Sequence, residues 1–257
     1  MSTAVRIESS GLQLAGSLCR PPVSAAGGAK ARPGLVLCHG FPTEGKRARV
    51  SGQTYPQLAE RIAAEAGWVV LTFNFRGTGE SEGDFSLNGW LADLRDAVDY
   101  LLEVEQVTGV WVAGFSTGGA LAVCTAGEDE RVQGVASLGA PADFHDWLAD
   151  PKRFLEHARS VGVIRTPGYP ADFEAWVREL REARPLSLIG KIPPRPVLIV
   201  HGAVDDVVPL MDARALADAA AGEVELRVVA GAGHALRHDP RAIAVLLGWL
   251  ERQQLTT

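Results

Sequence analysis

Hydrophobic and polar residues follow two patterns along this chain, an alternating one near the start and continuous apolar runs further on. Near the start, apolar residues alternate with polar ones on both sides of a Ser-Ser-Gly turn at residues 9–11, which predicts an antiparallel hairpin at a sheet edge. Residues 20–33 are rich in Pro, Gly and Ala, so we expect a loop. The continuous apolar run Gly34–Leu37 that follows is typical of a strand buried on both faces.

Strands and helices then alternate. The predicted strands are 68–73, 110–114, 132–138, 197–200 and 224–229, and the predicted helices are 55–66, 89–104, 118–126, 212–221 and 241–251. Strands joined by helices of this length need right-handed crossovers. We therefore expect an α/β fold with a mostly parallel, twisted sheet flanked by helices.

The stretch from Pro141 to about Lys191 breaks this rhythm. It shows helix-like pieces at 143–149, 151–161 and 171–182 and no clear strand. A connection of this length is too long for a simple loop, so we predict a core of residues 1–140 and 191–257 with a small helical cap at 141–190. Its aromatic residues either line a pocket or pack against the sheet: Trp147, Phe154, Tyr169, Phe173 and Trp176.

Composition narrows the class of protein without giving a function. A net charge of −6 with 47% hydrophobic residues is globular and argues against nucleic acid or an anionic membrane as the main partner. The 3 cysteines are too few for a disulfide scaffold or a Cys₄ zinc site, so we expect buried free thiols. With no visible signal peptide or membrane span, the sequence predicts a soluble cytoplasmic protein. The oligomeric state stays open, with a homodimer among the options.

The segment Gly114–Gly118 reads Gly-Phe-Ser-Thr-Gly between a predicted strand and a predicted helix. In this context G-x-S-x-G indicates a nucleophile elbow, in which the serine occupies a tight, strained turn. A Cβ two residues before or after Ser116 would collide with neighbouring backbone, which accounts for both glycines. The helix N-terminus behind Ser116 favours negative charge. The alternative is a Gly-rich turn that contains a serine by chance.

A serine hydroxyl is a poor nucleophile until a base removes its proton. His234 follows the last predicted strand and is the predicted base. It lies at the carboxyl ends of the strands, where Ser116 also lies. The rival is His238, one helical turn further on, for which we expect a surface role. The other histidines are expected to form structural hydrogen bonds at strand ends (His39, His201) or to be solvated (His145, His157).

The base needs a carboxylate that fixes its tautomer and stabilises the imidazolium. Asp205 and Asp206 follow the strand 197–200, and neighbours in an extended loop point to opposite sides. We choose Asp205 as the inward carboxylate, while Asp206 could cap the next turn. Asp143 or Asp146, after the preceding strand, is a minor alternative.

An oxyanion formed on Ser116 needs preorganised donors. The backbone N–H of Thr117, directly after the nucleophile, is one candidate, and that of Phe41, after the strand that ends at Cys38, is the other.

Taken in order, these segments resemble the α/β-hydrolase superfamily, specifically small serine esterases and acyl-peptidase-like hydrolases with a short cap. The matching pieces are His39–Phe41, Arg76–Ser81, Gly114–Gly118, His201–Pro209 and Gly233–His234. The resemblance implies an α/β-hydrolase fold with Ser116 as nucleophile, Asp205 as acid and His234 as base. It also implies that the Phe41 amide contributes to an oxyanion hole of the single-glycine type.

Two loops fit this resemblance less directly. Arg76–Gly79 resembles a structural loop of these enzymes, and the competing interpretation as a phosphate cradle lacks a G-x-G-x-x-G or Walker pattern. Thr43–Gln53 carries Lys46, Arg47 and Arg49. This loop is either a solvated basic loop, a lid over the pocket or a site for an acidic substrate group.

The sequence therefore predicts a serine hydrolase that cleaves carboxylic esters of small molecules through an acyl-enzyme, with no cofactor and no metal. The same triad also serves amide or thioester hydrolysis, because pocket and cap decide the leaving group. Carbon–carbon bond hydrolysis or lyase chemistry is a weaker alternative. A non-catalytic receptor on a hydrolase fold is the alternative from a different class.

Overall fold

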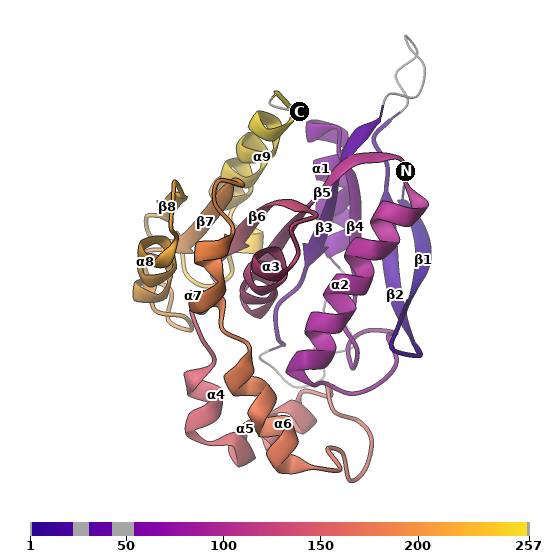
Figure 1. Ribbon diagram of the computed structural model, residues 1–257, viewed down its shortest axis with the longest axis vertical. Helices are drawn as coiled ribbons and strands as arrows, with labels where there is room; N and C mark the ends of the chain where they lie inside the picture. Colours follow the sequence, from indigo (N-terminus) through magenta and orange to yellow (C-terminus); the bar gives the residue numbers. More distant parts are fainter. Residues whose placement is uncertain (1, 23–30, 43–53, 256–257) are drawn as a thin grey trace.

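A computed structural model describes residues 2–22, 31–42 and 54–255 of the chain, which form one eight-stranded sheet in the order β1-β2-β4-β3-β5-β6-β7-β8 (Figure 1). The strands are β1 (Ser2–Ser9), β2 (Leu12–Cys19), β3 (Arg32–Cys38), β4 (Val69–Phe73), β5 (Val107–Phe115), β6 (Val132–Leu138), β7 (Val197–Gly202) and β8 (Glu225–Val229). Strands β3 to β8 run parallel, while β1 and β2 form an antiparallel hairpin at one edge. This confirms the predicted fold class.

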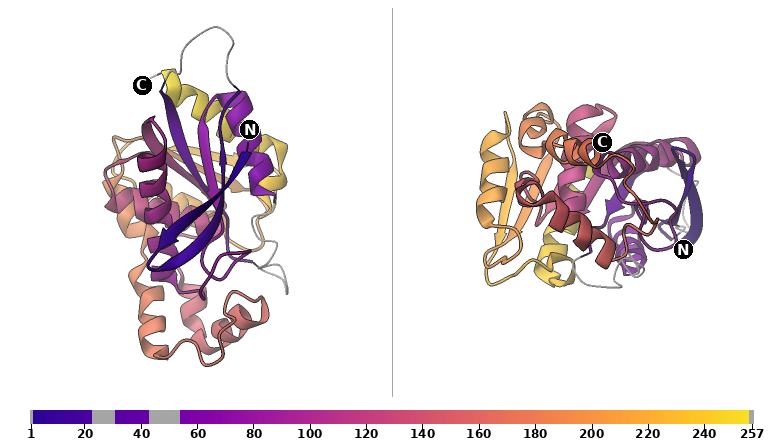
Figure 2. Two further views of the ribbon diagram at one scale, coloured as in Figure 1. Left: turned by 90° about the vertical axis from the view of Figure 1, so that its right-hand side faces the viewer. Right: turned by 90° about the horizontal axis from the view of Figure 1, so that it is seen from below.

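Helices cover both faces of the sheet, as the two remaining views show (Figure 2). The long helices are α1 (Tyr55–Ala66), α2 (Leu87–Val104), α3 (Thr117–Glu128), α8 (Leu210–Ala219) and α9 (Pro240–Leu255). Strand β3 shows how the faces divide, since Leu35 and Leu37 pack with α1 and α9 whereas Val36 between them packs with α2 and α3. Because side chains alternate along a strand, a run buried on both faces serves two separate cores.

Segment 141–190 joins β6 to β7, and most of it projects below the sheet in Figure 1. It contains α4 (His145–Ala149), α5 (Pro151–Ser160), α6 (Phe173–Glu182) and α7 (Pro185–Leu188), followed by the 3₁₀ turn η2 (Ile189–Lys191). No strand occurs in this segment, all of which the structure describes. The expected helical character is thus present, with α4 and α6 each starting two residues later than the pattern indicates.

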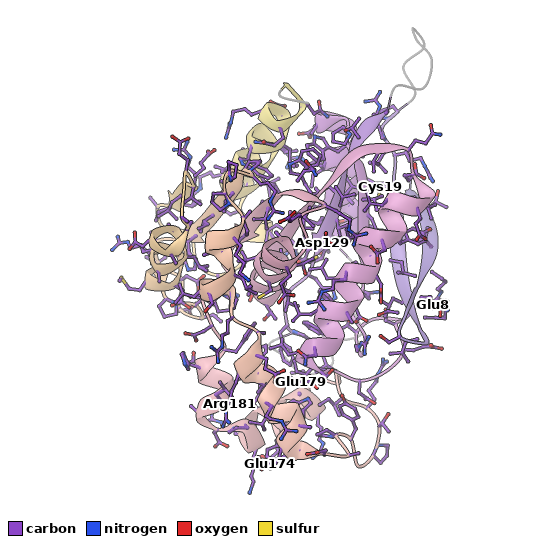
Figure 3. All side chains as sticks on the ribbon, in the orientation of Figure 1. Glu8, Cys19, Asp129, Glu174, Glu179 and Arg181 are labelled. Atoms are coloured by element: carbon purple, nitrogen blue, oxygen red, sulfur yellow. The ribbon has the colours of Figure 1, made fainter. Side chains whose placement is uncertain are left out.

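The aromatic residues of this segment pack on one another and on Phe85 of the core. Trp147 stacks on Phe154 with ring centroids 4.2 Å apart, and Phe154 lies 5.6 Å from Trp176 and 5.8 Å from Phe85. On α6, Glu179 accepts a hydrogen bond from the backbone N–H of Asn88 at the start of α2 (3.1 Å; Figure 3). The structure therefore supports packing as one role of these aromatics.

Loop Arg76–Gly79 has a structural basis. The Arg76 guanidinium and backbone N–H both bind Asp93 of α2 (2.7 and 2.8 Å), and the Asp93 side chain is fully buried. Gly77 adopts a positive φ of 78°, and a Cβ there would lie 2.2 Å from the Val163 carbonyl oxygen. The glycines thus serve a tight backbone contact, which favours the structural interpretation of this loop over the phosphate cradle.

Some helix and strand ends differ from those that the pattern predicts. Strand β5 begins at Val107, three residues before the predicted start, because Val107 pairs with Arg32 at the start of β3. Helix α9 continues to Leu255, beyond the predicted end at Glu251.

The structure also bears on the cysteines and on a membrane span. Cys19, Cys38 and Cys124 are buried and free, as the sequence predicts. Within residues 2–22, 31–42 and 54–255, no helix combines the length and apolar content that a membrane crossing requires.

Candidate active site

Ser116 lies in the turn between β5 and α3, in a conformation that few non-glycine residues adopt. Its φ and ψ are 53° and −128°, and its backbone N–H donates to the Leu138 carbonyl of β6 (2.8 Å). A Cβ on Gly114 would lie 2.2 Å from the Gly118 carbonyl oxygen, and one on Gly118 would lie 2.3 Å from the His39 carbonyl oxygen. Strain of this kind costs about 1–3 kcal/mol and persists only where surrounding contacts impose it.

His234 approaches this serine from the loop after β8. Its Nε2 lies 2.9 Å from Ser116 Oγ, and its Nδ1 lies 2.9 Å from Oδ2 and 3.1 Å from Oδ1 of Asp205. A carboxylate only accepts, so Nδ1 carries the hydrogen and Nε2 is left to accept from the serine hydroxyl. The ring is 18% exposed. It is therefore largely shielded by protein and keeps some contact with solvent.

Asp205 turns inward and Asp206 outward, as the sequence predicts for neighbours in an extended loop. The Asp205 carboxylate is fully buried, and its Oδ1 accepts from the backbone N–H groups of Val207 (3.0 Å) and Val208 (2.9 Å). Asp143 instead binds the exposed His145 ring, with Oδ2 2.6 Å from Nδ1. The structure therefore brings Asp205 to His234.

The loop after β3 lies directly against the serine turn. A Cβ on Gly40 would lie 2.8 Å from Ser116 Cβ, so only glycine permits this approach. The Phe41 ring packs at centroid distances of 5.1 Å from Phe85, 5.2 Å from Trp147 and 5.4 Å from Phe154. The backbone of residues 39–41 thus sits beside the N-terminus of α3, where Thr117 begins the helix. The roles of the Phe41 and Thr117 backbone N–H groups as oxyanion donors stay a prediction.

Two further residues near the site carried no clear signal in the sequence. The Arg237 guanidinium lies over the Tyr55 ring, 4.9 Å from its centroid, and donates to the Thr54 hydroxyl. Tyr55 in turn packs edge-on against Phe115, the residue before Ser116 (5.8 Å). These contacts connect the His234 loop to the serine turn. The rival base His238 is exposed, and its Nε2 accepts a hydrogen bond from the Arg237 guanidinium (2.6 Å).

His39, at the end of β3, forms the structural hydrogen bonds expected for it. Its Nδ1 donates to the Gly40 carbonyl (2.8 Å), and its Nε2 accepts from the backbone N–H of Phe75 (3.2 Å). Burial in this aromatic surrounding lowers the pKa of His39 to about 4. The ring is therefore neutral at neutral pH and steadies the Gly40 peptide.

This lowered pKa makes a prediction for stability. Since an unfolded histidine titrates near 6.5, the unfolded chain binds the proton first, and the contribution of His39 is complete above about pH 6.5 and lost as pH falls through about 4. We expect the difference in unfolding free energy between the native protein and His39→Gln to shrink by about 3 kcal/mol from pH 7 to pH 4. Urea titrations at each pH measure it, and parallel curves for both proteins would contradict it.

Two pockets lie near these loops, and Ser116 lines neither of them. One, of about 470 Å³, is lined by His234 and its neighbours in the loop, together with Asp206 and His238. A second pocket, of about 490 Å³, lies between α4, α6 and α7, away from Ser116. The basic loop Thr43–Gln53, with Lys46, Arg47 and Arg49, lies outside the described residues.

A serine at a strained strand–helix turn, a histidine after the last strand and a buried aspartate, all at the carboxyl edge of a parallel sheet, are the arrangement of an α/β-hydrolase site. A family model of the alpha/beta hydrolase family matches residues 35–246. The chain belongs to this family.

Similar proteins agree with this membership. A 31.7 kDa Escherichia coli protein from the traX-finO intergenic region, described as uncharacterized, is 28% identical and aligns over 79% of this chain and 83% of its own length. Among solved structures, the esterase domain of a Rhodothermus marinus protein superposes with a TM-score of 0.68 at 25% identity, and Est1E from Butyrivibrio proteoclasticus with 0.70 at 21%. Each covers 98% of both chains. The fold and family support a hydrolase, with esterases among its structural neighbours.

Proposed function

We propose that this protein is a serine hydrolase of carboxylic esters in which Ser116, His234 and Asp205 form the catalytic triad. The observation that carries the proposal is the continuous chain from Ser116 Oγ to His234 Nε2 (2.9 Å) and from His234 Nδ1 to Asp205 Oδ2 (2.9 Å). The three side chains are in hydrogen-bond contact without any movement of the chain, which supports the roles of nucleophile, base and orienting carboxylate for them.

In the first half-reaction, Ser116 Oγ attacks the ester carbonyl carbon while His234 Nε2 takes the hydroxyl proton. Asp205 keeps the hydrogen of the ring on Nδ1 and stabilises the imidazolium that forms. The oxyanion of the tetrahedral intermediate is assigned to the backbone N–H groups of Phe41 and Thr117. One such donor is typically worth about 10²–10³ in rate.

Collapse of this intermediate breaks the bond to the alcohol, and His234 returns its proton to the departing alkoxide oxygen. The acyl group is then held on Ser116 Oγ as an ester. In the second half-reaction, water gives a proton to His234 Nε2 and attacks the acyl carbon, and the carboxylic acid leaves as Ser116 regains its proton.

We assign segment 141–190 to a cap over this chemistry. Its residues Trp147 and Phe154 contact the Phe41 ring, so the backbone proposed to bind the oxyanion is braced by the segment. A small cap built of packed aromatics suits the partner we propose, a small-molecule acyl ester. Its contacts also make the acyl-group preference a property of this segment.

A substrate panel combined with active-site labelling tests the proposal. We expect a fluorophosphonate probe to modify Ser116 and kcat/KM to be highest for a p-nitrophenyl ester among an ester, an acyl-CoA and an aminoacyl anilide. Faster cleavage of the thioester or the anilide would overturn the ester assignment and keep the triad. Folded protein that no probe labels at Ser116 would instead indicate the non-catalytic receptor.

A further inference from the structure

His201 is a fully buried histidine at the end of β7 that takes no direct part in the proposed proton transfer. Its Nε2 lies 2.9 Å from the Val208 carbonyl oxygen and 3.4 Å from Oδ2 of Asp205. Because both neighbours only accept, Nε2 carries the hydrogen. Nδ1 of the same ring is buried and has no hydrogen-bond partner within the described part of the chain.

The bond to Val208 closes the loop that carries Asp205. The carbonyl of Val208 accepts from the His201 ring, and the N–H of Val208 donates to Asp205 Oδ1 (2.9 Å). Val208 is itself buried. The His201 ring therefore fixes the residue that orients the aspartate, and it adds a longer contact to the other carboxylate oxygen.

Backbone hydrogen bonds fix the opposite side of the loop. The N–H groups of Ala203 and Val204 donate to the carbonyls of Val229 and Ala232 (both 3.0 Å), and Ala232 lies two residues before His234. Backbone bonds thus set where the loop lies relative to His234. Besides its bond to His234, the rotation of the carboxylate within the loop depends on Val207, Val208 and the ring of His201.

We propose that His201 is a positioning residue that holds Asp205 in line with His234 Nδ1, an inference that rests on the proposed function. The polarity of the site supports it. A buried imidazole whose Nδ1 has no partner among the described residues costs free energy that an apolar side chain of similar size would avoid, and the hydrogen bond donated by Nε2 offsets part of this cost. A displacement of the order of 1 Å in such a supporting contact typically costs about 10²-fold in rate.

Three variants separate the effect of the hydrogen-bond donor at Nε2 from the effect of the space that the ring fills. His201→Gln places an amide N–H near the position of Nε2, His201→Asn is too short to reach Val208, and His201→Met fills the space without a donor. With p-nitrophenyl butyrate we expect Asn and Met to lower kcat by about 10- to 100-fold with KM within about 2-fold, and Gln to stay within about 3-fold of the native protein.

A spectroscopic readout that needs no turnover accompanies the kinetics. In the native protein we expect a far-downfield proton resonance from His234 Nδ1–H, assigned by its loss in His234→Ala. The resonance should persist in His201→Gln and weaken or disappear in His201→Asn and His201→Met. Melting temperatures recorded on the same samples report how far each variant is destabilised.

Two results would overturn the inference. One is native kcat and a native resonance in the folded Met or Asn variant. The other is an equal loss of kcat in all three variants, in step with their melting temperatures, while the resonance stays unchanged. That result would indicate a merely structural role for His201. A resonance that depends on the His201 donor in a protein without ester turnover would leave the positioning role standing and overturn the proposed function.

Discussion

Ser116→Ala is expected to lower kcat for p-nitrophenyl butyrate by about 10⁶-fold, the scale on which loss of a triad nucleophile acts. The reason is chemical, since the methyl group has no lone pair to attack the carbonyl carbon. Residual rate comes from the backbone donors and from binding. The fold should be retained, because alanine carries the same Cβ through the strained turn at φ 53°.

The matched control is Ser137→Ala, in the neighbouring strand β6. Ser137 Oγ is buried without a hydrogen-bond partner among the described residues, so its loss should leave kcat within about 2-fold and the melting temperature nearly unchanged. Steady-state kinetics and fluorophosphonate labelling of both variants make the comparison. Native turnover by the Ser116→Ala protein would exclude the serine mechanism.

Asp205→Asn is expected to lower kcat by about 10⁴-fold while the site keeps its geometry. Two backbone N–H groups, of Val207 and Val208, donate to Oδ1, so the carbonyl oxygen of an asparagine takes that position. Its NH₂ then faces His234 Nδ1, where Oδ2 lies 2.9 Å away in the native protein. A donor there forces the hydrogen of the ring onto Nε2, and His234 can no longer accept the serine proton.

Asp206→Asn is the control one residue away. The Asp206 side chain is exposed, so the same chemical change there should alter kcat by less than about 2-fold. Steady-state kinetics on both variants test the pair, with circular dichroism as the check on folding. Equal effects at the two positions, or a larger effect at Asp206, would refute the assignment of the acid to Asp205.

Much of the site could be predicted because its residues carry strict local constraints. Ser116 needs glycines at 114 and 118, and the structure shows why, with carbonyl oxygens 2.2 and 2.3 Å from where a Cβ would stand. His234 could be placed at the same edge as Ser116, since loops after parallel strands leave the sheet together. Each inference needed only local pattern and the direction of the strands.

Other features depend on contacts between distant parts of the chain. The packing of the Phe41 ring with Trp147 and Phe154 joins residues more than a hundred positions apart. The link from Arg237 to Tyr55 likewise has no periodicity that marks it. The contact from His201 to Asp205 spans only four residues, but it depends on the fold of the loop between them, which the pattern does not show. Strand and helix ends also differ from the pattern, since β5 extends back through Thr108 to Val107, where it pairs with Arg32 of β3.

The sequence by itself determined the parallel α/β sheet, the serine turn and the order of the loops, because alternation, glycine spacing and turn chemistry act over a few neighbouring residues. Only the tertiary structure decided how the cap aromatics pack, what His201 contacts and how Arg237 reaches Tyr55. Those outcomes depend on side-chain direction and on the space left by distant residues, which no local pattern encodes.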